Sequence, residues 1–184
     1  MKGIIFNLLE QVVTDAHGSD TWDELLVASG LDGVYTSLGN YDDDELIALV
    51  GAASQKLGTP PDDLVRWFGS SAIELLAVQH PDFFEGHQST QPFLETLNDI
   101  IHAEVRKLYP DALVPNFDFV TTGDGDFALG YQSPRQLCAL AEGFVEGAAR
   151  YFGEAVSIEQ PTCTKRGDDR CLIVCRFGAG SQWR

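Results

Sequence analysis

The chain has 184 residues, 44% of them hydrophobic, and a net charge of −16 at pH 7. This length suits one domain with a sizeable core. The acidity excludes a phosphate-binding surface, so no nucleic-acid partner is expected. No apolar run approaches the roughly 18 residues that span a bilayer, which excludes a membrane-spanning domain. The first residues lack a signal-peptide pattern, and we therefore predict a cytoplasmic protein.

The first hundred residues are predicted to be mostly helical. Apolar side chains recur at helical spacing over 3–16, and Thr21 and Glu24 have the spacing of a capping box for a helix over 19–28. Four consecutive acids at 42–45 indicate the start of a third helix, where the macrodipole favours negative charge. Pro60 is predicted to be the first residue of a fourth helix.

A fifth amphipathic helix is predicted from Phe93 to Tyr109, where Pro110 ends it. From residue 116 the apolar period changes to two, which predicts a hairpin with strands over 116–122 and 127–131. A helix from Pro134 to Phe152 and a second hairpin over 155–163 and 170–178 follow. The predicted fold class is α+β: a helical N-terminal subdomain (1–60) joined to a subdomain with an antiparallel sheet and helices (61–184).

Two groups of polar residues carry candidate chemistry. His102 lies on the flank of the fifth helix, where a histidine is usually only a half-exposed side chain. Tyr131, Ser133 and Arg135 occupy alternate positions and share one face if the segment is extended. A phenol, a hydroxyl and a guanidinium on one face are hydrogen-bond donors that could bind two carboxylate groups. Alternatively, Tyr131 packs in the core and Ser133 caps the following helix.

Together these residues resemble the H-NOX family, the heme domains that bind nitric oxide or oxygen and include the sensor domain of soluble guanylate cyclase. Pro115, the opening residues 1–7 and the run 141–149 add to the resemblance, which covers nearly the whole chain and fits the NO-selective bacterial type. It implies a heme b between the two subdomains, with His102 as axial iron ligand and the heme propionates bound by Tyr131, Ser133 and Arg135. The expected apolar lining is Ile5, Leu9, Leu75, Leu97, Ile101, Pro115, Leu140 and Phe144.

The resemblance also predicts which gas binds. Oxygen-binding members carry a tyrosine five residues beyond the motif arginine, and this chain has Leu140 there. The ferrous protein is therefore expected to bind NO and carbon monoxide but not oxygen. NO weakens the iron bond opposite to it, so release of His102 is the expected signal. A sensor histidine kinase, or a diguanylate cyclase or phosphodiesterase, is the implied partner.

This interpretation makes the domain a sensor and not an enzyme. No distal histidine–arginine pair is apparent in the sequence, which argues against a heme peroxidase.

The cysteines define an alternative function. Cys138, Cys163 and Cys171 match zinc-binding positions of some bacterial relatives, but Gln160 stands where one relative has a histidine. Cys175 is too far along its strand to replace it, roughly 13 Å from Cys171. A zinc site, a thiol redox switch, or cysteines packed as small apolar residues are all compatible with this pattern.

Overall fold

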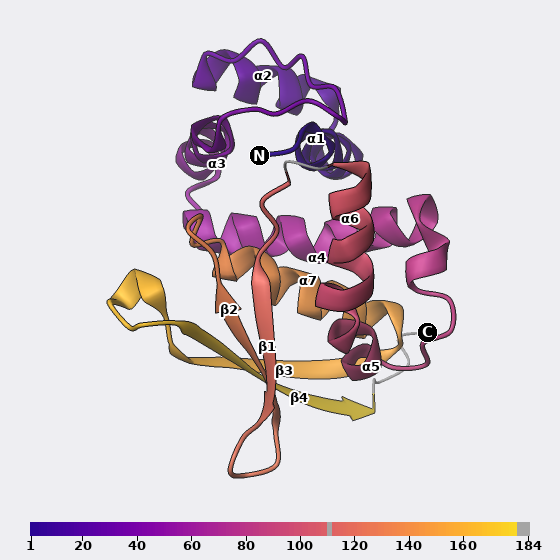
Figure 1. Cartoon of the computed structure of the whole chain (residues 1–184). Coiled ribbons are helices and arrows are strands. Elements are labelled where there is room, and N and C mark those ends of the chain that lie inside the picture. The colour runs from indigo at the N-terminus through magenta and orange to yellow at the C-terminus, as the bar shows by residue number, and fades with distance from the viewer. Residues whose placement is uncertain (110–111, 180–184) are drawn as a thin grey trace.

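Two helices packed on a four-stranded antiparallel sheet form the centre of an α+β fold (Figure 1). The structure, a computed structural model, describes residues 1–109 and 112–179. The helices and short turns in chain order are α1 (Gly3–His17), α2 (Ser19–Ser29), α3 (Asp43–Leu57), α4 (Pro61–Gln79), η1 (Pro81–Phe83), α5 (Thr90–Glu95), η2 (Leu97–Ile101), α6 (His102–Leu108), α7 (Cys138–Tyr151) and η3 (Thr164–Arg166). The strands are β1 (Asn116–Thr121), β2 (Phe127–Gln132), β3 (Glu154–Thr162) and β4 (Cys171–Ala179).

The sheet has the strand order β1-β2-β4-β3, and both predicted hairpins are confirmed. Tyr131 pairs with Phe117 on one side and with Cys171 on the other, so the motif tyrosine is fixed in a central strand. β3 changes register between Glu159 and Thr162, close to the turn that carries Cys163. The sheet therefore holds the motif tyrosine and two of the cysteines in neighbouring positions.

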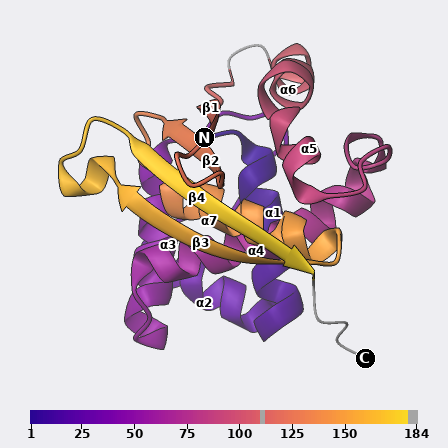
Figure 2. The ribbon, with the colours of Figure 1, turned by 90° about the horizontal axis from the view of Figure 1, so that it is seen from below.

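Helices α4 and α7 divide the molecule into two apolar cores. One core joins α1, α2, α3 and one face of α4 to Leu140 of α7, and the other joins the sheet to α5 and the opposite face of α7. Figure 1 shows α1, α2 and α3 on one side of the α4–α7 pair and the sheet on the other, while α5 and α6 lie beside β1. Viewed from below, β3 and β4 run across α7 (Figure 2). The boundary after residue 60 stays a prediction.

Glycines allow α4 and α7 to pack at very short range. A Cβ atom on Gly143 would lie 2.1 Å from the Arg66 carbonyl oxygen, and one on Gly147 would lie 2.5 Å from that of Ser70. Both neighbours are backbone atoms and cannot turn away. The bulk of any side chain here would force the two helices apart.

We expect Gly143→Ala to lower the free energy of unfolding by about 2–3 kcal/mol through overpacking. Gly51 of α3 is the matched control, because a Cβ there meets nothing within 4 Å. Gly51→Ala should instead raise stability by roughly 0.5–1 kcal/mol through the better helix propensity of alanine. Urea unfolding of the two variants measures both effects, and equal stability changes would refute this packing.

Four sequence predictions about helices are wrong in detail. The helix from Phe93 to Tyr109 is interrupted: η2 is a π-helical turn in which the Ile101 amide donates to the Thr96 carbonyl, and α6 then begins at His102. Pro110, which was predicted to end this helix, lies outside the described residues. Helix α4 begins at Pro61, because the residue before a proline favours extended backbone.

The helix predicted from Pro134 begins instead at Cys138. Residues 133–136 form a turn, with the Gln136 amide donating to the Ser133 carbonyl and a Gln136 φ of 53°. The capping box at Thr21 is also wrong: Gly18 precedes α2, and the Thr21 hydroxyl donates to the His17 carbonyl. Within residues 1–109 and 112–179, no helix is both long and apolar enough to cross a membrane.

Candidate functional site

His102 is the first residue of α6, directly after the π-helical turn. Its ring stacks on Phe117 of β1, with centroids 5.8 Å apart and planes 25° from parallel. The Nδ1 atom is buried and has no hydrogen-bond partner of good geometry among the residues that the structure describes, while the side chain as a whole is half-buried. A buried ring nitrogen without a partner costs free energy, so its position calls for an explanation.

The pKa of His102 is lowered to about 4: burial is the largest cause, the nearby Arg106 cation adds to it, and the Pro115 backbone offsets part of the shift. The imidazole is therefore neutral at pH 7. Neutral imidazole is the form that binds a metal through a ring nitrogen. The surroundings of His102 thus prepare it for ligation.

A chain of rings and hydrogen bonds joins His102 to the motif tyrosine. Phe117 lies between His102 and Tyr131, with 5.8 Å between the ring centroids on either side. Asn98 in the π-helical turn donates from Nδ2 to the Phe117 carbonyl at 2.6 Å and accepts from the Phe117 amide at 3.2 Å. These two bonds fix the turn before His102 to strand β1.

The motif tyrosine and arginine have different partners. The buried Tyr131 hydroxyl accepts from the Leu137 amide at 3.1 Å, and burial raises its pKa. Arg135 donates from Nε to Asp43 at 2.7 Å and from Nη1 to the Leu113 carbonyl at 2.6 Å. Among the described residues Nη2 of Arg135 has no partner. The turn over 133–136 therefore replaces the single extended face predicted for the motif, although Ser133 still lies beside Tyr131.

Asp43 connects the motif arginine to the start of the chain. Its carboxylate accepts from the Met1 ammonium at 2.7 Å as well as from Arg135. Burial raises the pKa of Asp43, but these hydrogen bonds and positive charges outweigh it and hold the pKa below its ordinary value of 3.8. One carboxylate at the start of α3 thus ties together segments from three parts of the sequence.

We expect Asp43→Asn to destabilise the protein at pH 7 by less than about 1 kcal/mol, because half-exposed ion pairs contribute little. Since the pKa of Asp43 is lowered by folding, its contribution is full above the ordinary value and is lost as the pH falls through the folded value. Urea unfolding at pH 7 and below pH 3 measures this. Asp44→Asn, one exposed residue further on, is the control. An equal loss in both variants, or one that persists in acid, would contradict the role of Asp43.

Seven of the eight apolar candidates, all but Pro115, pack in or against the two cores. Five pack in or against the core of the N-terminal helices: Ile5, Leu9, Leu75, Leu140 and Phe144. Leu97, Ile101 and again Phe144 pack against the core of the sheet. Leu9 and Leu140 are buried, whereas the other six, including Pro115, are only half-buried.

These observations fit a heme. A neutral imidazole with an unpartnered ring nitrogen, half-buried apolar side chains from both cores, and an arginine with a free nitrogen match its three requirements: an axial ligand, a flat apolar slot, and a partner for its propionates. His102 would ligate the iron, and Arg135 with Tyr131 and Ser133 would hold the propionates. No Cys-x-x-Cys-His motif occurs in the sequence, so attachment would be non-covalent.

Three cysteines form a second cluster at the other end of the turn that follows Tyr131. The Sγ atoms of Cys138, Cys163 and Cys171 lie within 4.8 Å of one another, with Cys163 at 3.7 Å and 3.8 Å from the other two. Burial raises the pKa of the Cys138 thiol. Burial also raises the pKa of Cys171, but hydrogen bonds from Thr164 and the neighbouring thiols reverse the shift and lower it. Cys175 is buried apart from this cluster, as predicted.

Asp43, Asn98 and Phe117 were not predicted from the sequence as site residues. Asp43 was assigned only a role at the start of a helix, and its partner Arg135 is 92 residues away. Asn98 gives a weak signal, since asparagine is a poor helix former in the middle of an apolar pattern. Phe117 is one of several aromatic residues at alternate positions. The alternation predicts which face of the strand it lies on, but not that its ring packs against His102.

Comparisons with known proteins agree on one family. A family model described as Haem-NO-binding matches residues 2–160. The soluble guanylate cyclase gcy-35 of Caenorhabditis elegans is 28% identical over an alignment of 163 residues, and the match covers 82% of this chain and 23% of that protein. The chain therefore spans about a quarter of the length of this curated relative.

Solved structures extend the likeness to the whole fold. A crystal structure of an H-NOX protein from S. oneidensis in the Fe(II)NO state is 36% identical, with a TM-score of 0.89, and the match covers 97% of this chain and 99% of that one. An NMR structure of the H-NOX domain from Shewanella oneidensis in the Fe(II)CO state is also 36% identical, with a TM-score of 0.86 and the same coverage.

The fold and these likenesses define the class of protein, an α+β heme-binding sensor domain. The chain belongs to the haem-NO-binding, or H-NOX, family.

Proposed function

We propose that this domain senses nitric oxide through a b-type heme, and that His102 both ligates the iron and transmits the signal. The observation that carries this proposal is the neutral, half-buried imidazole of His102 at the junction of a π-helical turn and α6, whose buried Nδ1 has no partner of good geometry within residues 1–109 and 112–179. Unusual turns of this kind often mark functional positions. When bound, the heme would supply a ferrous iron able to bind the gas, and His102 is the residue that would hold this iron.

The apolar candidates on the side of the N-terminal helices support selectivity for NO and CO over oxygen. None of Ile5, Leu9, Leu75, Leu140 and Phe144 has a hydrogen-bond donor in its side chain. Oxygen bound to iron carries partial negative charge and needs such a donor, whereas NO depends on it far less. Leu140 is the central residue, because it occupies the position of the tyrosine expected in oxygen-binding relatives.

Movement of α6 is the proposed output. This helix of seven residues continues directly from η2 and has no fully buried residue. Release of His102 would let α6 shift while Asn98 keeps the turn attached to β1. A ligand that favours one of two positions shifts the population between them. We propose a sensor histidine kinase, or a diguanylate cyclase or phosphodiesterase, as partner in the cytoplasm. The likeness to the soluble guanylate cyclase gcy-35 supports a role in signalling.

Gas titration of the purified, reduced protein tests this proposal. We expect NO and CO each to shift the visible absorption spectrum, and air to leave no lasting oxygen spectrum before the iron oxidises. A persistent spectrum of an oxygen complex in air would contradict the selectivity. A protein that takes up no heme when hemin is supplied would contradict the function itself.

A second candidate function is redox or zinc sensing by the cysteine cluster. The observation that favours it is the mutual distance of at most 4.8 Å among three buried thiols. Gln160 lies beside Cys138 but is not one of the usual zinc ligands, so the described part of the chain places three ligands here. Measuring bound zinc before and after peroxide tests this candidate. Signalling that survives His102→Gly but not Cys138→Ser would favour it over heme-based sensing.

A further inference from the structure

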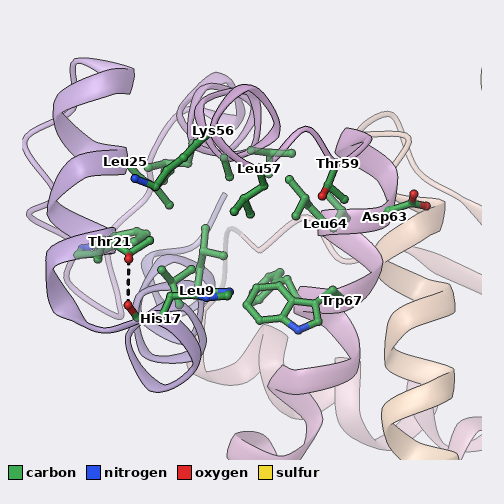
Figure 3. A pocket seen from close by; sticks show the side chains of 17 residues that line it. Leu9, His17, Thr21, Leu25, Lys56, Leu57, Thr59, Asp63, Leu64 and Trp67 are labelled. Carbon is green, nitrogen blue, oxygen red and sulfur yellow. Dashed lines mark hydrogen bonds between the residues drawn. The ribbon is translucent and has the colours of Figure 1, made fainter.

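A cavity of about 520 Å³ lies among α1, α2, α3 and α4 in the N-terminal half of the molecule (Figure 3). None of His102, Tyr131, Ser133 and Arg135 lines it, and Leu9 is the one apolar heme candidate that does. The cavity is therefore distinct from the site described above. Its volume lies within the range of about 300–1,000 Å³ that is usual for small-molecule sites.

Aromatic and aliphatic side chains form most of the cavity wall. Trp22 and Trp67 both line it. Trp22 is buried, and Trp67 is half-buried, with its ring 5.7 Å from that of His17 (Figure 3). Leu57 on the opposite side is 50% exposed. Tryptophan rings offer flat apolar faces on which another ring can stack. The wall is thus suited to a flat molecule.

The charges around the cavity disfavour an anion. Lys56, a lining residue, is paired with Glu24, so its positive charge is already neutralised. Asp63 lies at the edge and makes no ion pair within the described part of the chain. The first hundred residues as a whole are strongly acidic, with Lys2, Lys56 and Arg66 as their basic residues apart from histidine. An ammonium group, in turn, would lose its hydration against apolar walls.

We propose that this cavity binds an uncharged aromatic molecule of about two rings, independently of the heme. The apolar walls supply the affinity, and the two tryptophans supply the preference for a flat shape. The domain would then bind a second small molecule besides the gas, and binding at this cavity would not depend on which gas the heme binds.

Three naphthalene derivatives of similar size test the proposal by calorimetry on the heme-loaded protein. They are 2-naphthol, which is uncharged at pH 7, 2-naphthoate, an anion, and 2-naphthylmethylammonium, a cation. We expect 2-naphthol to bind and both charged analogues to bind at least about tenfold more weakly, because each would place an unpaired charge against apolar walls. Absence of binding by 2-naphthol, or equal binding by either ion, would overturn the proposal.

Two variants locate the site. Ala53→Phe puts a ring into the cavity from α3 and should weaken 2-naphthol binding more than about tenfold by filling it. Val27→Phe is the matched control, because Val27 is 84% exposed and does not line the cavity. Unchanged binding by Ala53→Phe would overturn the proposal. Circular dichroism shows whether each variant folds.

A measurement on the unmodified sequence keeps the test valid if Ala53→Phe fails to fold. The indole N–H signals of Trp22 and Trp67, assigned with Trp22→Phe and Trp67→Phe, should shift in nitrogen-15 spectra when 2-naphthol binds. The affinity should also be the same with and without saturating CO. Tryptophan signals that do not shift when 2-naphthol is added, or an affinity for 2-naphthol that CO abolishes, would place the ligand elsewhere and overturn the proposal.

Discussion

Replacing His102 with glycine is expected to change the absorption spectrum of the reduced, heme-loaded protein and to accelerate heme loss. Removal of a ligand should cost more than removal of a residue that merely supports one, which typically weakens metal binding about ten- to hundredfold. We therefore expect heme transfer to a scavenger protein to be at least about tenfold faster. Because His102 contacts Phe117 and lies at the start of α6, the variant also removes the link between the cofactor and this helix.

Added imidazole provides the control for this experiment. It should enter the space left by the side chain and restore the spectrum, since it supplies the same nitrogen ligand without the backbone connection. The chain has three other histidines, His17, His80 and His87, and glycine at each should leave the spectrum unchanged. If one of these variants changes the spectrum and His102→Gly does not, the ligand assignment is wrong.

The second large effect is expected at Leu140, where Leu140→Tyr should convert the protein toward oxygen binding. Leu140 is buried on α7 against Gly69 of α4, within the core that contains Leu9. A hydroxyl that donates to the partial negative charge on bound oxygen contributes about 1.5–3 kcal/mol, or roughly ten- to a hundredfold in affinity. Oxygen titration of the reduced variant by absorption spectroscopy measures this gain.

Leu140→Phe separates the hydroxyl from the size of the ring. Phenylalanine adds nearly the same volume as tyrosine but no donor, so it should leave oxygen affinity near that of the parent protein. Both variants strain the contact with Gly69, and similar stability losses are expected in each. Equal oxygen affinity for the two variants would show that the distal hydrogen bond does not determine which gas binds.

Much of this fold can be predicted from the sequence, because its elements have strong patterns. The alternation around Phe117 and Phe119 and the turn over 123–126 define the first hairpin, and the distance between Cys163 and Cys171 confirms the second. The approach of Cys138 to the other two cysteines does not follow from these patterns and was implied by the family resemblance alone. The family resemblance was equally recognisable from short motifs.

The remaining features depend on interactions that no local pattern encodes. A π-helical turn places apolar residues almost as an α-helix does, so spacing alone did not reveal the interruption before His102. Ser133 and Pro134 look like the start of a helix, but the left-handed backbone of Gln136 delays it to Cys138. The contact of Asp43 with Arg135 joins segments that are far apart in the sequence. The sequence alone did not indicate it, because an acidic residue at this position is equally well explained by its favourable interaction with the start of a helix.

The measurement that tests the central claim most directly is the iron–histidine stretching band in the resonance Raman spectrum of the reduced protein. If the His102 imidazole holds the iron, a band is present that shifts when histidine is labelled with nitrogen-15, disappears in His102→Gly and disappears when NO is added. A band that remains in His102→Gly, or no histidine-sensitive band in the parent protein, would contradict the account.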